Sequence, residues 1–337
     1  MEAAWQSLDL NDAGSRAAWD AVCLERPEPS AFHSAAWGRA IARTYGADCR
    51  SVRSGSALFP LFGVRTLSGK RRLVSVPYAP YGGMLPLPED RTAAPPMPMP
   101  DGACVAVRQV EMAVADTQAL TEADRVTMWL DLPSAPEALW KSLNAKVRNQ
   151  VRKAEKEGVT ATAGREEHLA AFYRLYARRM HELGTPAHPP AFFKALLEEF
   201  PEAEFLVAEH QGQPVGTVFD IGWGGWRVNL YGATLFEKRS LCANNLVYWK
   251  SLERGCTGGR RYDFGRSLFG SGQYEFKRQW GALPHRVAER RFLRENGAWR
   301  EAADAVEAVN PLLPRIWQRL PAPVASWLSG RLRKHVF

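Results

Sequence analysis

The hydrophobic positions of the chain switch between helical and strand-like spacing. Phe32, Trp37 and Ile41 recur every four or five residues, which predicts a helix with one buried face. Ser54-Gly55-Ser56 separates two short apolar runs and is typical of a hairpin turn. The first part of the chain is predicted to form helices at 14–24, 33–45 and 101–115, and strands at 48–53, 57–64 and 125–131.

The later part of the chain repeats this order of helices, hairpin, helix and strand. Its predicted elements are helices at 166–182, 190–200 and 244–256, strands at 203–210, 214–222, 225–232 and 260–264, and a short helix and a strand within 272–294. The shared order predicts an α/β fold of two related units, with a cleft between them. We expect the first unit at 1–131 and the second at 161–300.

A basic helix at 135–157, within a linking segment at 132–160, is expected between the two units. Its apolar positions follow helical spacing, while lysines and arginines, among them Arg148 and Arg152, occupy the other faces. These basic residues can bind phosphate, but a solvated face is the more common use of such a helix.

The C-terminal tail, residues 301–337, mixes apolar residues and prolines with basic residues. The basic residues are Arg315, Arg319, Arg331, Arg333 and Lys334. A helical tail packed on the body is the favoured interpretation, and a helix lying on a membrane surface is the alternative. The proline-rich segment 85–100 is expected to be a surface loop.

Composition narrows the class of protein. The chain has 337 residues, 46% hydrophobic and 24% charged, which excludes disordered, collagen-like and coiled-coil proteins. Its 44 basic and 36 acidic side chains give a net charge of +8, which suits an anionic partner such as a phosphate-bearing substrate, an RNA end or a lipid surface. Five scattered cysteines and seven histidines show no metal-ligand spacing, so no metal site is expected. We expect a cytoplasmic protein, because the sequence shows neither a signal peptide nor a membrane-spanning apolar run.

Residues 262–282 form the strongest candidate site. The sequence lacks the motifs of nucleotide triphosphatases, serine hydrolases and Rossmann dehydrogenases. Glycine-rich backbone at a strand end, as around Gly265, lets a ligand approach closely and offers N–H donors to an oxyanion. Arg266 can bind a carboxylate or phosphate with two parallel bonds, and Lys277 adds a point charge. Asp263 can orient Arg266, accept a proton, or serve as a buried structural acceptor.

Several segments along the chain share one pattern. They are Phe32, His33 and Trp37; Ser75 to Gly83; Leu139-Trp140; Leu183 to Pro186; Cys242 to Trp249; and, most specifically, Asp263-Phe264-Gly265-Arg266-Ser267 with Phe276-Lys277 and Trp280-Gly281. This pattern resembles the FemAB-like branch of the GNAT acyltransferase superfamily, and more narrowly the FemAB proteins associated with exosortase (PEP-CTERM) and exopolysaccharide gene clusters. The chain departs from that pattern at Phe269-Gly270-Ser271-Gly272, which bears on substrate specificity.

The resemblance implies tandem GNAT-like units and transfer of an acyl or aminoacyl group to an amine or hydroxyl of a cell-envelope or exopolysaccharide precursor. The donor would be acyl-CoA or aminoacyl-tRNA, neither bound permanently. The usual acetyl-CoA loop is absent before the helix at 244–256, where Phe236 to Leu241 stand instead. The catalytic residues are predicted to be Arg266, Lys277, Asp263 and Tyr274. The substrate-binding residues are predicted to be Tyr231, Asn244, Tyr248, Ser267, Gly272, Arg148, Arg152 and Tyr81.

The expected partners follow from the same resemblance. They are an anionic small-molecule, saccharide or peptide precursor, tRNA for an aminoacyl donor, and the inner face of the membrane through the basic tail, but not DNA. An aminoacyl-tRNA-dependent peptidoglycan peptidyltransferase is the first alternative, and a non-catalytic GNAT-like binding module is the second. An RNA-binding protein ranks last, because aromatic and basic residues are not interleaved in an RNA-binding pattern.

Overall fold

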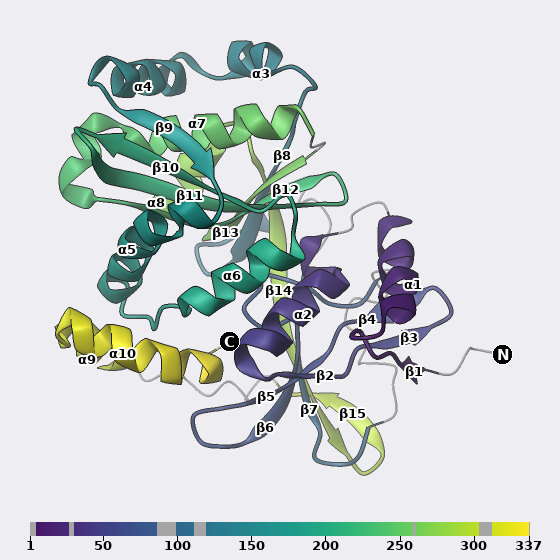
Figure 1. Ribbon diagram of the computed structural model, residues 1–337. Coiled ribbons are helices and arrows are strands. Elements are labelled where there is room, and N and C mark those ends of the chain that lie inside the picture. Colours follow the sequence, from purple (N-terminus) through teal and green to yellow (C-terminus); the bar gives the residue numbers. More distant parts are fainter. Residues whose placement is uncertain are drawn as a thin grey trace. The chain divides into compact units, whose positions relative to one another are not determined.

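The protein is described by a computed structural model that covers residues 5–26, 30–85, 99–110, 119–258, 261–302 and 312–336 (Figure 1). The chain forms two compact units. The first unit consists of Met1–Met112, Arg286–Asn310 and Arg331–Phe337, and the second of Ala113–His285 and Pro311–Gly330. The observed boundaries differ from the predicted ones. The chain leaves the first unit after Met112 and returns to it at Arg286.

The first unit combines two helices with short strands. Its elements are β1 (Gln6–Ser7), α1 (Ala13–Leu24), η1 (Ala31–His33), α2 (Ala35–Tyr45), β2 (Asp48–Cys49), β3 (Val52–Ser54), β4 (Ala57–Phe59), β5 (Phe62–Arg65), β6 (Arg71–Ser75), β7 (Cys104–Val110), most of β14 (Leu283–Glu295), β15 (Ala298–Glu301) and η5 (Arg333–His335). Three strands form a small sheet in the order β1-β3-β4, and a second series runs β2-β5-β6-β7-β14. The predicted hairpin at Ser54 is confirmed, because Val52 pairs with Phe59 across it.

The prediction of a helix at 101–115 is wrong. Cys104–Val110 form the strand β7, which pairs with β6 on one side and β14 on the other. Val105 and Val107 alternate toward the core, and this spacing of two suits β-branched side chains on a sheet. The last residues of the predicted helix, 111–115, and most of the predicted loop at 85–100 lie outside the described residues.

The second unit is a six-stranded mixed sheet between helices. Its elements are β8 (Arg125–Asp131), α3 (Pro136–Ser142), α4 (Ala145–Lys156), β9 (Thr160–Gly164), α5 (Glu166–Glu182), α6 (Pro190–Glu199), β10 (Glu204–His210), β11 (Gln213–Trp223), β12 (Trp226–Thr234), η3 (Phe236–Leu241), α7 (Ala243–Cys256), β13 (Arg261–Leu268), α8 (Gly272–Arg278), α9 (Leu312–Arg319) and α10 (Ala322–Leu332). The strands follow the order β8-β13-β12-β11-β10-β9. The predicted α/β class is confirmed.

The expected single helix at 135–157 is two helices. Leu143 leaves the helical conformation, and Asn144 starts α4 by accepting a hydrogen bond from the N–H of Val147 at 2.9 Å. The apolar stripe of this segment nevertheless stays buried, because α4 packs on α7. The sequence predicted one long helix because the helical spacing of these apolar residues continues unchanged through Leu143 and Asn144, where the helix is interrupted.

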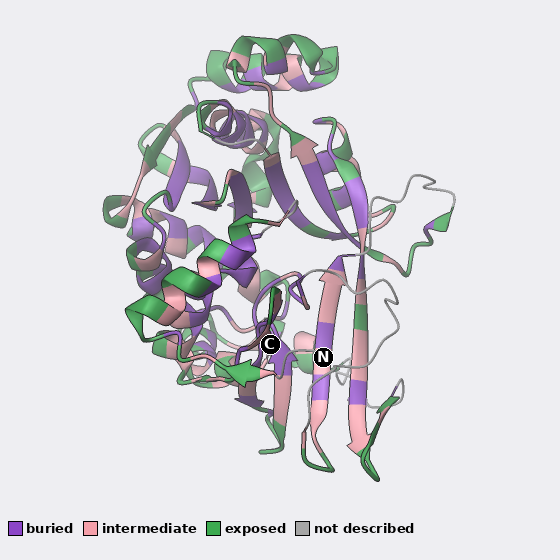
Figure 2. Cartoon of the chain, turned by 90° about the vertical axis from the view of Figure 1, so that its right-hand side faces the viewer, coloured by how far each residue is buried: buried purple, intermediate pink, exposed green. Residues whose placement is uncertain are grey.

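Two apolar layers hold this sheet. One face packs against α7, while α5 and α6 cover the other with a cluster of rings that includes Phe172, Phe193, Phe205 and Phe219. Figure 2 shows that buried residues gather on the strands, whereas the outer surfaces of the helices are exposed.

Candidate functional site

The strands β12 and β13 separate part-way along their length. They pair in parallel from Trp226 with Arg261 to Val228 with Asp263, and no further pair joins them within the described chain. Each strand nevertheless continues, β12 to Thr234 and β13 to Leu268. Since α7 connects the two parallel strands, its N-terminus lies at the same end of the sheet as this opening. Ligands of open α/β sheets bind at such carboxyl ends of strands.

Both strands carry a β-bulge where they separate. On β12, Tyr231 pairs with Phe219 and Asn229 with Asp220, so Leu230 is an extra residue. On β13, the register shifts between Asp263 and Arg266 against β8, which gives β13 an extra residue there as well. Bulges redirect backbone and side chains and are frequent beside active sites.

Gly265 is required at the bulge of β13. Its φ of +73° lies in the left-handed region. A Cβ atom at this position would lie only 3.1 Å from the carbonyl oxygen of Asn229 on β12. The two backbones therefore still lie close together at Gly265, where the pairing of the strands has ended.

Lys277 places a buried ammonium group beneath this bulge. The side chain is 7% exposed, and Nζ donates to the carbonyl oxygens of Gly265 and Arg266, both at 2.9 Å. Burial lowers the pKa of Lys277 to about 8. The positive charge of Arg266 lowers this pKa further, whereas the negative charge of Asp263 raises it. The described residues provide no hydrogen-bond acceptor for its third N–H. That donor is available to a ligand.

The residues around Lys277 differ in their contacts and in their exposure. The carboxylate of Asp263 is fully buried, and its Oδ1 accepts from Thr127 Oγ1 and from the N–H of Gly265, both at 2.7 Å. Asp263 therefore fixes the bulge. The Oγ of Ser267 is buried and has no hydrogen-bond partner within the described residues. The side chain of Arg266 is exposed, and its charge acts on Lys277.

Tyr248, on α7, reaches the bulge of β12. Its hydroxyl donates to Asn229 Oδ1 at 2.9 Å, and Asn229 Nδ2 in turn donates to Asp220 Oδ1 at 2.8 Å. A Cβ on Gly232 would lie 3.0 Å from this hydroxyl, so the group lies against the backbone of β12. Burial raises the pKa of Tyr248, and the charge of Asp220 adds to this effect. The phenol therefore stays neutral and can still accept a hydrogen bond.

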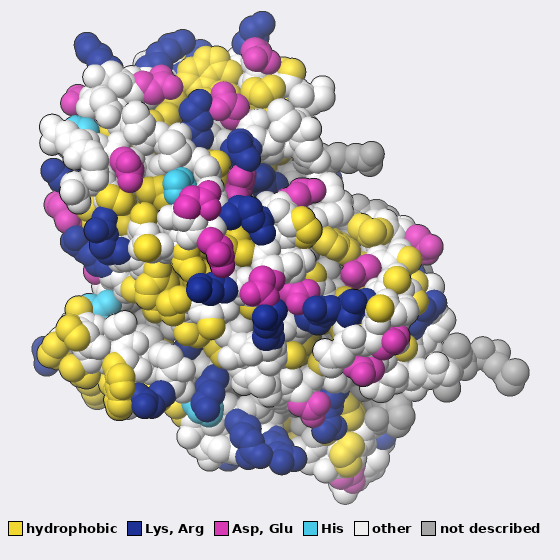
Figure 3. Space-filling model, in the orientation of Figure 1, with side chains coloured by type: hydrophobic (Ala, Val, Ile, Leu, Met, Phe, Trp, Pro, Cys, Tyr) yellow, Lys and Arg dark blue, Asp and Glu magenta, His cyan; other side chains and the backbone are white. Residues whose placement is uncertain are grey.

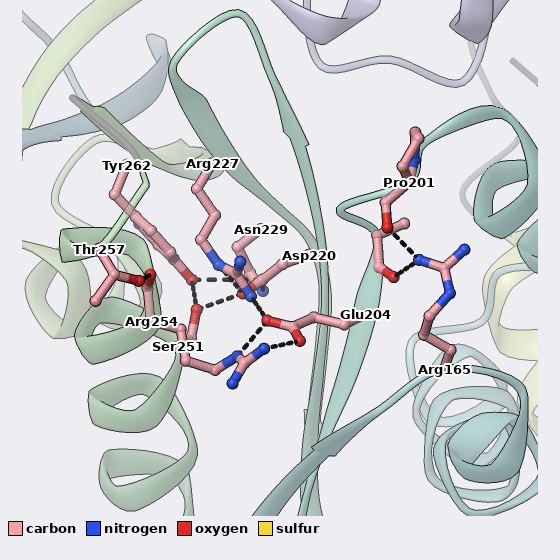
Figure 4. Close-up of polar contacts among 11 residues, drawn as sticks. Arg165, Pro201, Glu204, Asp220, Arg227, Asn229, Ser251, Arg254, Thr257 and Tyr262 are labelled. Atoms are coloured by element: carbon pink, nitrogen blue, oxygen red, sulfur yellow. Dashed lines mark hydrogen bonds and ion pairs between the residues drawn. The ribbon is translucent and has the colours of Figure 1, made fainter.

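Asp220 also belongs to a buried ionic network, drawn in Figure 4. Arg227 Nε donates to Asp220 Oδ2 at 3.0 Å, and its NH2 group contacts Glu204. Arg254 binds both oxygens of Glu204 at 2.6 Å. Burial alone would raise the pKa of Glu204, but the hydrogen bonds from Arg254 and the charge of Arg227 leave it below the usual value. Sequence reasoning missed this network, although Asp220 in the apolar run Val218 to Ile221 was a visible signal.

Some of the predicted residues lie elsewhere in the units. Tyr231 belongs to the ring cluster under α5 and α6, 5.0 Å from Tyr176 between ring centroids. Tyr274 is buried with its ring 4.8 Å from Phe269, and Gly272 is the exposed first residue of α8. Tyr81 is buried in the first unit, edge-on to Phe32 at 5.0 Å.

Three further predicted residues have structural contacts. Asn244 lies in the first turn of α7, whose N-cap residue is Cys242 in the left-handed conformation, and Asn244 Oδ1 accepts a hydrogen bond from Thr234 Oγ1 at 3.1 Å. Arg148 donates to carbonyl groups at the end of α3, including that of Lys141 at 3.2 Å. The guanidinium of Arg152 lies 5.6 Å from the ring centroid of Trp140. Substrate binding by these residues stays a prediction.

The first unit contains an open cavity of about 600 Å³ with a basic lining. The charged residues along it are Arg50, Arg65, Arg71, Arg72 and Lys334, against Asp48 and Asp101. The excess of cations favours an anionic ligand. Within the described part of the chain, no group of three or more His, Cys, Asp or Glu side chains could hold a metal ion.

Comparison with known proteins identifies the fold of this site. Residues 141–278 match the family model of the acetyltransferase (GNAT) domain, a span that includes the separated strands, Tyr248 and Lys277. The solved structure of FemX matches 85% of the chain and 96% of its own length, with 12% identity and a TM-score of 0.60. Residues 141–278 thus match a GNAT domain, and the likeness to FemX shows that the chain shares its fold.

Two other solved structures are similar to the chain. A conserved protein of unknown function from Bacteroides thetaiotaomicron VPI-5482 matches 87% of the chain and 100% of its own length, with 9% identity and a TM-score of 0.53. A tandem GNAT protein from the clavulanic acid biosynthesis pathway matches 88% and 98%, with 14% identity and a TM-score of 0.49. No curated protein matches the chain by sequence.

The domain match supports one class of reaction. Acyl transfer is the reaction of an acetyltransferase (GNAT) domain, so the match supports an acyl- or aminoacyltransferase. The predicted likeness to the GNAT superfamily and the predicted α/β fold class are confirmed. No helix among the described residues combines the length and the apolar character needed to cross a bilayer.

Proposed function

We propose that this protein transfers an acyl or aminoacyl group to an amine or hydroxyl of an anionic cell-envelope or exopolysaccharide precursor, at the opening between β12 and β13. The observation that carries the proposal is the ammonium of Lys277, buried beneath the bulge of β13 with one N–H available. A buried cation beside an open strand edge is suited to a negative charge that develops during reaction.

The transfer requires no covalent enzyme intermediate. The acceptor nitrogen or oxygen attacks the carbonyl carbon of the donor, and the carbonyl oxygen becomes an oxyanion. The third N–H of Lys277 and the free hydroxyl of Ser267 are the donors available to that oxyanion. Collapse of the intermediate breaks the bond to the donor's sulfur or oxygen, and the proton lost by the acceptor balances the one gained by the leaving group.

Tyr248 is proposed to position the substrate. Its neutral hydroxyl is oriented by Asn229 and, through Asn229, by the carboxylate of Asp220. With its proton donated to Asn229, the hydroxyl oxygen can accept a hydrogen bond from an N–H or O–H of the substrate. Such positioning supplies a large part of the rate of a group transfer.

The donor is acyl-CoA or aminoacyl-tRNA. The 3₁₀ helix η3 occupies the segment before α7, in which the sequence lacks the usual acetyl-CoA loop. Its Arg239 guanidinium lies over the ring of Phe236, 4.2 Å from the centroid, and Glu237 is paired with Arg178. Lys238 and Arg239 are exposed cations in this segment, so it does not discriminate between the two donors.

An anionic acceptor is supported by the net charge of +8. A sugar phosphate or nucleotide-linked sugar carries the required negative charge. A peptidoglycan peptide precursor would do so as well, and is the alternative acceptor.

The test is a transfer assay with purified full-length protein. Radiolabelled acetyl-CoA and a pool of charged tRNA are offered as donors, and a UDP-linked amino sugar and a muramyl pentapeptide precursor as acceptors. We expect label in one acceptor, and a loss of at least about a hundredfold in Lys277→Met. Absence of transfer for every pair, or equal transfer by the variant, would contradict the proposal.

A further inference from the structure

We propose that the outer surface of α9 and α10 binds an anionic lipid bilayer. Five large apolar side chains project from these two helices, with exposed fractions between 43% and 61%. They are Leu312, Leu313, Ile316, Val324 and Trp327. Single exposed apolar residues are ordinary on a protein surface, whereas a group on two consecutive helices marks an interaction site.

The opposite side of this helix pair is fixed to the second unit. Gln318 Nε2 donates to the carbonyl oxygen of Glu182 at 2.7 Å, and the hydroxyl of Ser329 accepts from the N–H of Ala187 at 3.1 Å. Trp317 and Ser329 are buried there. The inner side of the helix pair already packs on the second unit, so the five exposed side chains form a separate, outward-facing apolar surface.

Charge identifies the partner as an anionic surface. Residues 312–332 contain no Asp or Glu, and all three of their basic side chains are exposed. These are Arg315, Arg319 and Arg331. Glu182, on the α5 end beneath, is paired with Arg178 and Arg179. Figure 3 shows hydrophobic side chains over α9 and α10 with lysines and arginines at their border.

The same charge argues against a second copy of this chain as the partner. Two identical surfaces of this kind would bring like charges together, whereas the headgroups of an anionic leaflet neutralise them. An amphipathic helix with basic residues and an exposed tryptophan is typical of proteins that lie in the membrane interface. The pair α9–α10 is therefore a surface anchor rather than a membrane span.

The test is co-sedimentation of the full-length protein with vesicles, which requires no enzymatic activity and is independent of the proposed reaction. We expect binding to vesicles of equal parts phosphatidylcholine and phosphatidylglycerol, and weak binding to phosphatidylcholine alone. Replacing Arg315 and Arg319 by Gln should lower the partition coefficient about 25-fold, at roughly fivefold for each cation near an anionic surface.

A matched pair of variants tests the apolar part. Ile316→Glu with Trp327→Glu should abolish vesicle binding. Leu67→Glu with Leu283→Glu adds the same charge at leucines that are 59% and 66% exposed outside these helices, and should bind nearly as well as the parent. Circular dichroism confirms that each variant is folded. Equal binding by both pairs, or no binding of the parent to anionic vesicles, would overturn the proposal, as would a dimer in sedimentation velocity that only the first pair dissociates.

Discussion

Replacement of Lys277 by Met separates catalysis from stability at the proposed site. The fall of its pKa from 10.5 to about 8 means that keeping the buried ammonium protonated at neutral pH costs about 3 kcal/mol of folding free energy. Met removes that cost but leaves the carbonyl groups of Gly265 and Arg266 without their donor, at about 1–3 kcal/mol each. The two effects are of similar size and opposite sign, so the net change in stability should be small.

Activity should respond differently from stability. Loss of one oxyanion donor typically costs about 100- to 1,000-fold in rate. Single-turnover transfer from whichever donor is active, together with a thermal melt, measures both quantities on the same variant. Arg278→Met is the matched control, because Arg278 is the neighbouring cation and is exposed, and among the described residues it pairs only with Glu275 of the same helix.

The pH dependence gives a second readout of Lys277. Between about pH 8 and 10.5 the unfolded chain keeps a proton on Lys277 that the folded protein has released, so folding stability relative to Lys277→Met should rise with pH in this window. If the cation acts on the oxyanion, the transfer rate should fall over the same rise in pH. A variant with full activity, or a parent whose stability shows no such rise, would refute this account of Lys277.

Three other substitutions give distinct expectations. Arg266→Ala should lower transfer about tenfold to a hundredfold with an unchanged melting temperature, because the side chain is exposed; full activity would remove it from the site. Tyr248→Phe should lower both activity and stability, because Asn229 Oδ1 loses its hydrogen-bond donor. The loss of stability should be about 1–3 kcal/mol and can be measured by chemical denaturation. An unchanged denaturation midpoint would contradict this prediction. Glu204 has a pKa in the folded protein that is below its usual 4.5, so its carboxylate stabilises the fold above that pH and loses this effect as the pH falls through the folded value. The difference in unfolding free energy between the parent and Glu204→Gln should therefore disappear in acid. A difference that stays constant with pH would argue against the ionic network.

Local periodicity predicted much of the second unit. The helix expected at 166–182 is α5, with the same bounds, and the strand expected at 125–131 is β8. In both elements, the apolar residues keep the same spacing from one end to the other. The helix predicted at 101–115 failed because Cys104–Val110 alternates apolar side chains over only a few residues, and such a short run fits either period.

The site was only partly predictable for a related reason. Lys277 and Asp263 were recognised by residue type beside glycines, yet the burial of Lys277 depends on a bulge in β13 that has no sequence signature of its own. The network from Tyr248 through Asn229 to Asp220 joins three elements, so spacing along the chain does not reveal it. The sequence shows the chemical capability of each side chain. The groups that the side chain contacts depend on how the strands pair, which the sequence does not show.

The discontinuous first unit has a consequence for the order of events on the ribosome. β7, complete at Val110, pairs in the first unit with β14, whose paired residues are Val287–Leu293. The partner strand is thus translated about 180 residues later, a delay of roughly 9 to 36 s at usual elongation rates. Throughout that interval one edge of a valine-rich strand lacks its neighbour, and exposed edges of this kind recruit other strands. The nascent chain therefore has its greatest need of chaperone protection while the second unit is being made, before the oldest part of the protein can finish folding.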